Sequence, residues 1–514
     1  MTMSSTDQQA VIDFLMDPGT VNAGPVKVIT THVSVIFLSE HRVLKMKRAV
    51  QFPFLDFRLL EARREACERE VEINKRTAPS IYKGVLAVTK KNDGGFELGG
   101  TGEPVEWLVD MVRFDEDTLF DRLAGVDRGL RRPRIEALAD TIAAFHESAE
   151  IRPDRGGFTG TRLIAENNAR SFEVLPDGCL DAGLSKAVSM QTLQKIDVLG
   201  AVLDDRRDGG RVRVCHGDLH LRNICLVDDK PTLFDAIEFS TDFSDIDVLY
   251  DLAFLLMDLD SHGHRRLSAF LLNRYLDVAD ERADAFRVLP VFLSMRAQIR
   301  AHVGAAIANA QDNDIDRKRE LSIARQYLEQ AAAYLQPLPP RLVAVGGLSG
   351  SGKSRLAREV APYLGQAPGA RVVRTDVVRK RLSGIHPNES LGPEGYTPKM
   401  TEKTYASFFE QARSALAAGQ SVVLDAVFAK SEQRDQAEAL AITCGVPFDG
   451  LWVDAPEHVR VERVETRTRN VSDVTTEVAR QQSDYDLGII TWAKIDSAGK
   501  KKETIRQGLS VLKV

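Results

Sequence analysis

The residues with the clearest chemical signature lie in one short stretch, 347–354. Its sequence, Gly-Leu-Ser-Gly-Ser-Gly-Lys-Ser, follows an apolar run at 341–346 and matches the phosphate-loop pattern G-x-x-x-x-G-K-[ST]. Such a loop turns backbone N–H groups toward phosphate oxygens at the start of a helix, while its lysine and serine serve the phosphate charge and Mg²⁺. We expect an ATP or GTP site, with Ser354 also a Mg²⁺ ligand, formed by Gly347, Ser349, Gly350, Ser351, Gly352, Lys353 and Ser354.

A second set of oxygen-bearing side chains lies upstream, in residues 214–239. Asp218 and Asn223 are five positions apart in one polar loop, and Asp235 follows a short apolar run. An Asp can accept or orient a hydroxyl proton, and an Asn with a second Asp can hold Mg²⁺ against nucleotide phosphates. We therefore expect two unrelated nucleotide sites in one chain, with Asp218 catalytic here.

Two histidines in this stretch offer an alternative chemistry. His216 and His220 are spaced i,i+4, as in some zinc sites, but the sequence shows no third ligand of a suitable type near them. The acidic set explains the stretch better than a zinc site does.

Composition and charge narrow the class of protein. With 514 residues, of which 43% are hydrophobic and 28% charged, the chain is an ordinary globular protein long enough for two or three domains. The net charge of −6 argues against a general affinity for nucleic acid. Five cysteines without a C-x-x-C pair favour reduced thiols. Because no uncharged run approaches the ~18 residues of a membrane span, we expect a cytoplasmic protein that does not enter the membrane.

The patterning predicts a β-rich small lobe at about 20–113, followed by a helical large lobe at about 114–335. We expect strands at 26–38, 42–50, 84–89 and 105–112, and helices at 59–75, 118–123 and 135–146. The period of a strand puts Val43, Lys45 and Lys47 on one face. Prolines at 336–340 interrupt any helix, so that the first domain is expected at 1–335 and the second at 341–514.

The first domain resembles the aminoglycoside phosphotransferase family, from about residue 33 to residue 335. The resemblance is carried by His216-Gly-Asp218 with Asn223, by Phe234-Asp235, and by Tyr250-Asp251. It implies a bilobal α+β fold like that of protein kinases, Asp218 as the catalytic base, and Asn223 and Asp235 as Mg²⁺ ligands. An inactive scaffold with the same fold is the alternative.

The same resemblance implies a phosphate-binding lysine on a strand of the small lobe and a glutamate that pairs with it. Lys45 and Glu70 are the preferred pair. Lys47 shares the face of Lys45, so the choice between the two lysines stays open here.

The second domain resembles the P-loop kinases that include polynucleotide kinases, zeta toxins and chloramphenicol phosphotransferase, over about residues 341–507. The resemblance implies an α/β fold with a parallel sheet. Asp376 resembles the general base of these kinases and Arg379 their acceptor-binding arginine, although a helix-capping Asp followed by surface arginines is the alternative. Asp425, after an apolar run, is expected to help hold Mg²⁺, and Arg463 and Arg467 resemble arginines of the lid that contacts the nucleotide.

Together these patterns predict two fused kinases that use ATP and Mg²⁺ to phosphorylate hydroxyl groups of small molecules. For the second domain the acceptor could also be a nucleotide or a nucleic acid end, which the net charge does not support. A competing hypothesis makes the first domain a non-catalytic sensor that regulates the second. A third, a P-loop ATPase, is disfavoured by the Asp376-x-x-Arg379 pattern. Trp492 could either stack on adenine or fill a core.

Overall fold

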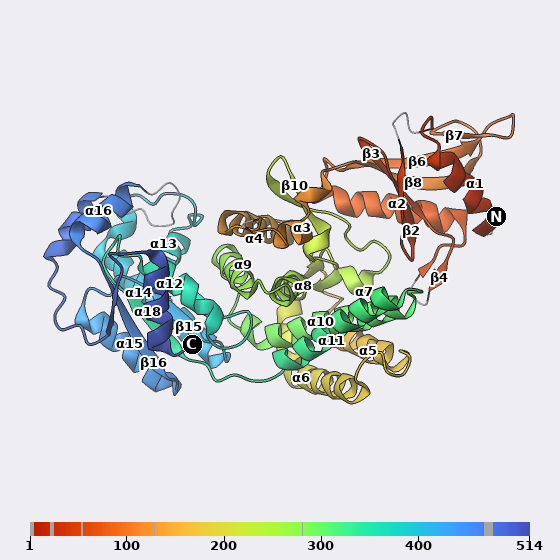
Figure 1. Ribbon diagram of the computed structural model, residues 1–514. Coiled ribbons are helices and arrows are strands. Elements are labelled where there is room, and N and C mark those ends of the chain that lie inside the picture. The colour runs from red at the N-terminus through yellow and green to blue at the C-terminus, as the bar shows by residue number, and fades with distance from the viewer. Residues whose placement is uncertain (1–4, 21–24, 53–54, 128, 280, 467–475) are drawn as a thin grey trace. The chain divides into compact units, whose positions relative to one another are not determined.

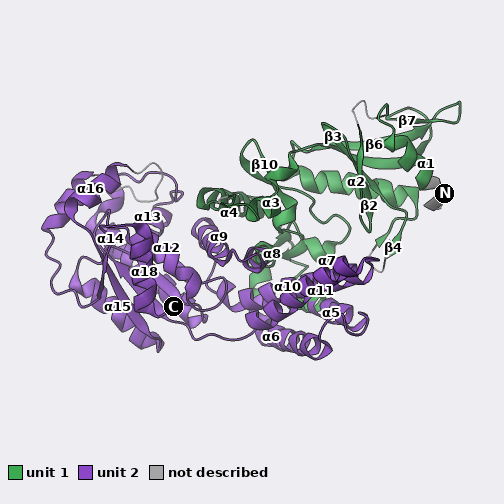
Figure 2. Ribbon diagram, viewed as in Figure 1, with its two compact units in different colours: residues 1–164, 205–255 green, residues 165–204, 256–514 purple. Residues whose placement is uncertain are grey.

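The computed structural model describes residues 5–20, 25–52, 55–127, 129–279, 281–466 and 476–514 (Figure 1). It forms two compact units, the first of residues 1–164 with 205–255 and the second of residues 165–204 with 256–514 (Figure 2). Three helices run from one unit into the other: α5 (Gly157–Glu173), α6 (Ala182–Asp208) and α8 (Val248–Ser261). Among the described residues, no helix combines the length and the apolar character that crossing a membrane requires.

The first unit begins with a six-stranded antiparallel sheet. Its strands, in spatial order, are β1 (Lys27–Thr30), β2 (Ser34–Leu38), β3 (Arg42–Lys47), β8 (Pro104–Val112), β6 (Tyr82–Lys90) and β7 (Phe96–Leu98). The single strand predicted at 26–38 is wrong, because the chain turns between β1 and β2. Thr31 makes this turn: its N–H donates to the Ser34 carbonyl at 2.8 Å, and its Oγ1 accepts from the Ser34 N–H at 2.9 Å.

Strand β3 separates two hydrophobic cores. Val43 packs with Val71 of α2 (Leu60–Lys75) on one face of the sheet. Leu44 and Met46 pack on the other face, in the core that contains Val11 of α1 (Ser5–Met16). Successive strand residues point to opposite faces, so Lys45 and Lys47, which both contact Glu70 of α2, lie on the Val43 face as predicted.

A tight hairpin in the first unit positions the acidic residues of the upstream motif. Strands β10 (Ile224–Val227) and β11 (Lys230–Leu233) pair antiparallel around a turn in which Asp228 and Asp229 have φ values of 50° and 58°. Two successive positive φ values are typical of a type I′ hairpin turn. Because Ile224 pairs with Leu233, the hairpin brings its two flanks together, with Asn223 before it and Asp235 after it.

The first unit also contains further strands and helices. They are β4 (Gln51–Phe52), β5 (Leu55–Asp56), η1 (Glu116–Thr118), α3 (Phe120–Ala124), α4 (Arg132–Ser148), β9 (Val212–Val214), η2 (Leu221–Asn223), α7 (Thr241–Ser244) and β12 (Asp245–Asp247).

The second unit contains a five-stranded sheet in which every neighbouring pair is parallel. The strand order is β14 (Arg371–Arg374), β15 (Val422–Asp425), β13 (Leu342–Gly346), β16 (Phe448–Asp454) and β17 (Ala493–Asp496). Every residue of β13, β14 and β15 is buried, as expected for strands covered on both faces. The predicted fold class, with a parallel-sheet P-loop domain after the kinase-like part, is confirmed.

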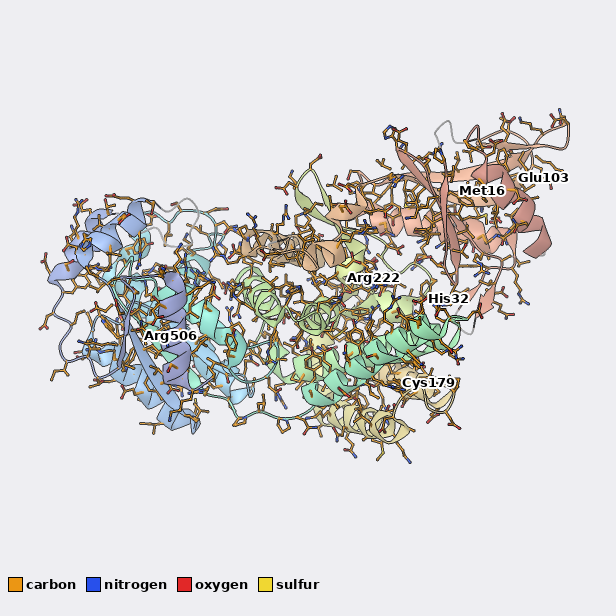
Figure 3. All side chains as sticks on the ribbon, viewed as in Figure 1. Met16, His32, Glu103, Cys179, Arg222 and Arg506 are labelled. Carbon is orange, nitrogen blue, oxygen red and sulfur yellow. The ribbon has the colours of Figure 1, made fainter. Side chains whose placement is uncertain are left out.

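Helices surround this sheet. They are α12 (Lys353–Val360), η3 (Ala361–Tyr363), α13 (Thr375–Leu382), η4 (Pro393–Tyr396), α14 (Pro398–Ala417), α15 (Ser431–Cys444), α16 (Glu457–Glu465), α17 (Thr476–Gln481), η5 (Gln482–Asp484) and α18 (Lys501–Leu512). Leu356 of α12 and Leu512 of α18 enter the core beside Val343 and Ile495. Arg506, labelled in Figure 3, is 75% exposed and pairs with Glu503 on the outer side of α18.

Three further helices belong to the second unit: α9 (Arg265–Val278), α10 (Ala285–Asn309) and α11 (Asp314–Tyr334). Asn273 of α9 hydrogen-bonds to the backbone of the edge strand β14 and of the residue before it. Its Nδ2 donates to the Ala370 carbonyl at 3.0 Å, and its Oδ1 accepts from the Val372 N–H at 2.7 Å. Asp277 of α9 pairs with the buried Arg371 at 2.7 Å. Helix α9 therefore provides partners for polar groups at this edge of the sheet that would otherwise be unpaired. The boundary at 336–340 stays a prediction.

Candidate functional site

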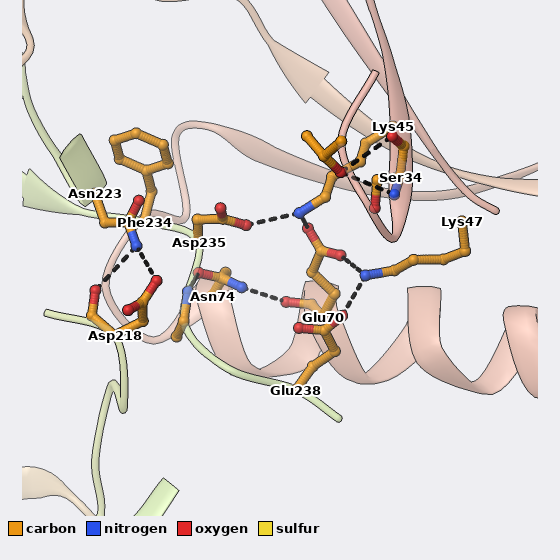
Figure 4. A network of polar contacts seen from close by, with 12 residues as sticks. Ser34, Lys45, Lys47, Glu70, Asn74, Asp218, Asn223, Phe234, Asp235 and Glu238 are labelled. Atoms are coloured by element: carbon orange, nitrogen blue, oxygen red, sulfur yellow. Dashed lines mark hydrogen bonds and ion pairs between the residues drawn. The ribbon is translucent and has the colours of Figure 1, made fainter. Parts of the chain in front are cut away.

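Lys45 lies at the centre of the polar network in the first unit (Figure 4). Its Nζ is 2.9 Å from Glu70 Oε1 and 2.7 Å from Asp235 Oδ1. Lys47 also reaches Glu70, at 2.5 Å from Oε2, but its second partner is Glu238. Since Lys45 contacts the predicted metal ligand Asp235 and Lys47 does not, the geometry favours Lys45 as the phosphate lysine.

Opposite charges in this network stabilise the ionised forms of one another. Burial alone would lower the pKa of Lys45, but the neighbouring Asp235 and Glu70 carboxylates outweigh it and hold this pKa well above its usual value. Burial alone would raise the pKa of Glu70, but Lys45 and Lys47 outweigh it and lower this pKa. Both lysines and Glu70 therefore remain charged near neutral pH.

The catalytic-loop residues lie beside this network. Asn223 Nδ2 donates to the carbonyl and to Oδ2 of Asp218, both at 2.9 Å, and His220 Nε2 lies 3.3 Å from the same carboxylate. The N–H of Phe234 donates to the Asn223 carbonyl at 3.0 Å, which ties this loop to the residue before Asp235. Asp218 and Asp235 keep 37% and 44% of their side-chain surface exposed. The structure thus brings together the predicted base and both predicted metal ligands, with oxygen donors of the kind that Mg²⁺ prefers.

Asp251 is a functional residue to which the sequence assigned no role. Its carboxylate is fully buried and accepts the N–H groups of His216 at 3.0 Å and Gly217 at 2.8 Å. His146 Nε2 lies 3.2 Å from the same carboxylate. Asp251 therefore fixes the backbone just before Asp218. Its position in the first turn of the apolar helix α8, where it is the only charged residue before Asp258, is the signal that could have revealed it.

The phosphate loop joins β13 to α12, as predicted. Gly347 has φ 144° and Gly350 has φ 84°, and a Cβ on Gly350 would lie 2.3 Å from the Arg460 carbonyl oxygen. Larger residues are therefore excluded at this position. The Lys353 side chain makes no hydrogen bond or ion pair with any residue that the structure describes. Its ammonium group is thus available to a phosphate.

The last residue of the loop lies beside the predicted metal aspartate. Ser354 Oγ donates to Asp425 Oδ1 at 3.1 Å, and Arg374 Nε lies 3.4 Å from Asp425 Oδ2. A hydroxyl and a carboxylate at this distance can serve one Mg²⁺ ion, either directly or through its waters.

The predicted lid arginines have different outcomes. Arg463 contacts the phosphate loop, since its Nη1 donates to the Ser351 carbonyl at 3.4 Å. Its Nη2 donates to the Ser497 carbonyl at 2.5 Å, which lies outside the loop in sequence. Arg467 lies outside the described residues. Gln482, which was not predicted, accepts the Ser349 N–H at 2.8 Å. The contacts of Arg463 support the loop, and its contact with nucleotide stays a prediction.

Asp376 and Arg379 occupy α13, one helical turn apart. Asp376 is half-buried, and its carboxylate has no hydrogen-bond or ion-pair partner in the described part of the chain. Arg379 is buried, donates to the Gly395 carbonyl at 2.8 Å, and lies 5.0 Å over the Tyr396 ring. It is therefore not one of the surface arginines of the alternative interpretation. Its contacts hold η4, and acceptor binding by Arg379 stays a prediction.

Trp492 fills a core. It is 5% exposed, its ring centroid lies 5.1 Å from that of Phe428, and its Nε1 donates to Glu438 Oε1 at 2.9 Å. These contacts leave no free face for adenine.

Comparisons with known proteins match both parts of the chain. The phosphotransferase enzyme family model matches residues 64–286, and the AAA domain model matches residues 342–485. An uncharacterized protein of Mycobacterium tuberculosis is 31% identical over 530 residues, which span 97% of this chain and 99% of that protein. An adenylyl-sulfate kinase of Myxococcus xanthus is 30% identical over 118 residues, or 23% of this chain and 59% of that enzyme.

Among solved structures, a choline/ethanolamine kinase family protein from Mesorhizobium loti is 14% identical to this chain. The match covers 65% of this chain and 98% of that one, with a TM-score of 0.40. The mycobacterial relative is aligned over almost its entire length. The first family model includes Glu70, Asp218, Asn223 and Asp235 but not Lys45, and the second includes the phosphate loop. The chain therefore belongs to the family of this mycobacterial protein and is a kinase-type phosphotransferase, in which a phosphotransferase enzyme family domain precedes a P-loop kinase domain.

Proposed function

We propose that each domain transfers the γ-phosphoryl group of ATP, bound as its Mg²⁺ complex, to a hydroxyl group of a small molecule. The observation that carries this proposal is the contact chain from Glu70 through Lys45 to Asp235, beside Asp218 and Asn223. An inactive scaffold would not need the base, the phosphate-binding lysine and the metal ligands to lie together in this way.

In the first site, Asp218 orients the acceptor hydroxyl and takes its proton as the new O–P bond forms. Lys45 neutralises phosphate charge as the bond from the γ-phosphorus to the bridging oxygen breaks. Asn223 and Asp235 would hold Mg²⁺, which supplies further charge neutralisation when it is bound. Positioning and charge account for most of the catalysis in such transfers.

In the second site, the loop N–H groups and Lys353 would bind the ATP phosphates, and Ser354 and Asp425 would hold Mg²⁺. The carboxylate of Asp376 would take the acceptor proton. The likeness to an adenylyl-sulfate kinase supports kinase chemistry here, and a nucleotide acceptor is compatible with it. The five free cysteines fit a cytoplasmic location, where thiols stay reduced and ATP is available.

The test incubates the full-length protein with Mg²⁺, γ-labelled ATP and a fractionated metabolite extract, and then identifies the labelled products. Transfer of label to phosphate monoesters is the expected result. Release of the label only as inorganic phosphate, in every fraction, would instead support the P-loop ATPase hypothesis.

A further inference from the structure

A buried ion pair joins Lys47 to Glu238, and neither residue has a role in the transfer described so far. The side chain of Lys47 is 1% exposed and that of Glu238 is 7% exposed. Figure 4 shows both directed toward Glu70 and away from Asp218. Charges this deeply buried are stable only when they are paired, because removing an ion from water is costly. Glu238 therefore depends on Lys47 for its pairing, whereas Lys47 also has Glu70 as a partner.

The ion pair of Lys47 with Glu238 fixes the end of the segment 235–238, which begins at Asp235. Asp235 has φ 61°, in the left-handed region that residues other than glycine seldom adopt. Its N–H donates to Tyr82 Oη at 3.2 Å, and the next N–H, of Ala236, donates to Asn74 Oδ1 at 2.9 Å. A conformation of this kind persists only where its surroundings hold it. The direction of the Asp235 carboxylate thus depends on the contacts along 235–238.

The contacts named for Asp235, Ala236 and Glu238 come from the small lobe, whereas the Ile237 N–H donates to the His216 carbonyl of the catalytic loop at 3.0 Å. Asn74 belongs to α2, Tyr82 to β6 and Lys47 to β3. Asn74 also donates to the carbonyl of Glu70 at 2.9 Å, so the same helix turn carries the glutamate that both lysines share. The segment after β11 is thereby attached to the sheet that carries Lys45.

The two lysines divide the carboxylates between them. Glu70 offers one oxygen to each lysine. Among the ion pairs of the described residues, the Asp235 carboxylate pairs only with Lys45 and the Glu238 carboxylate only with Lys47. When Lys45 turns to a phosphate and Asp235 to a cation, Lys47 still pairs with both Glu70 and Glu238. Lys47 therefore keeps both buried carboxylates paired without contacting the nucleotide.

We propose that Lys47 and Glu238 are positioning residues that hold Asp235 in its metal-binding orientation, and that only Lys45 meets the phosphates. This inference rests on the function proposed for the first site. It predicts that damage to the pair raises the requirement for Mg²⁺ and leaves the binding of metal-free nucleotide unchanged.

The test measures the binding of a non-hydrolysable ATP analogue to the full chain by calorimetry, as a function of Mg²⁺ concentration and in EDTA. Every protein carries Lys353→Ala, so that only the first site reports. Glu238→Gln should raise the Mg²⁺ concentration for half-maximal binding by about tenfold or more, as for other changes behind a metal ligand. The affinity in EDTA should stay within about twofold of the parent, because Lys45 is untouched. Lys45→Met should instead lower the affinity in EDTA as well.

Two further variants keep the result decisive. Lys47→Met combined with Glu238→Gln leaves no buried unpaired charge and should show the same shift in Mg²⁺ requirement. Glu68→Gln changes a half-exposed glutamate of α2 and should change neither quantity. An unchanged Mg²⁺ requirement, or an equal loss with and without Mg²⁺, would overturn the inference. If Asp235→Ala leaves the Mg²⁺ requirement unchanged, the metal assignment of the proposed function is wrong, and the inference falls with it.

Discussion

Ser354 Oγ donates a 3.1 Å hydrogen bond to Asp425 Oδ1, which joins the end of the phosphate loop to the end of β15. The register of the sheet explains this contact, since β13 and β15 are parallel neighbours and Val345 pairs with Asp425. The strand before the loop and the strand before the carboxylate therefore end together. Ser354 and Asp425, 71 positions apart in sequence, become neighbours in this way.

Asp425→Asn should weaken the Mg²⁺-dependent part of nucleotide binding at the second site. An amide keeps the shape of the side chain but loses the charge that attracts the cation, so we expect about a tenfold higher Mg²⁺ requirement or more. Titration with Mg²⁺ in the presence of an ATP analogue measures it. Asp435→Asn, at an exposed position of α15, is the matched control. Identical Mg²⁺ curves for the two variants would remove Asp425 from the metal site.

Asp376→Asn should lower turnover at the second site by about 100-fold or more, because it removes the group that receives the acceptor proton. ATP affinity should change little, since Asp376 follows β14 and lies outside the phosphate loop. Steady-state kinetics with an acceptor identified by labelling, together with calorimetry for ATP, separates the two effects. Normal turnover would contradict Asp376 as the group that receives the acceptor proton and would leave the second domain a nucleotide-binding module of unknown purpose.

Asn273→Ala should destabilise the P-loop sheet through its edge strand. The variant leaves the Ala370 carbonyl and the Val372 N–H without their side-chain partner, at an expected cost of about 1–3 kcal/mol in the free energy of unfolding. Urea denaturation followed by tryptophan fluorescence measures this loss. Gln436→Ala on the exposed side of α15 serves as the control. A fragment cut at 336–340 lacks α9 and should show a similar or larger loss, whereas full stability of that fragment would contradict the role of α9.

Acidic pH should lower the stability of the small lobe, because it protonates Glu70. Because the pKa of Glu70 is lowered in the folded protein, its stabilisation is complete above its unfolded pKa of about 4.3 and is lost as pH falls through the folded value. Wild type should therefore lose more stability than Glu70→Gln between about pH 5 and pH 3. Denaturation curves across this range test it, with Glu68→Gln expected to follow wild type. Parallel loss in wild type and Glu70→Gln would contradict the charged network.

The motifs made of contiguous residues could be predicted, because the residues that give each motif its chemistry are close together in the sequence. The phosphate loop needs glycines at fixed positions before Lys353, and the hairpin flanked by Asn223 and Asp235 needs only a short turn between two strands. The β period likewise placed Lys45 and Lys47 on one face. These features depend on local geometry, which a sequence pattern records directly.

The long-range partners were not predictable from the sequence. Lys45 and Lys47 differ only in which carboxylate each meets, Asp235 or Glu238, about 190 residues away. The contact of Asn273 with β14 joins a helix before the proline stretch to a strand after it. Pairings of this kind follow from tertiary packing, which no spacing in one sequence reveals.

The most direct measurement compares the labelled products of wild type, Asp218→Asn, Lys353→Ala and the double variant, each incubated with Mg²⁺, γ-labelled ATP and the same metabolite extract. Each single variant should lose a different subset of products, at least about 100-fold below wild type, and the double variant should lose them all. Loss of every product in Lys353→Ala, with none lost in Asp218→Asn, would contradict two separate transfer sites and would identify the first domain as a sensor.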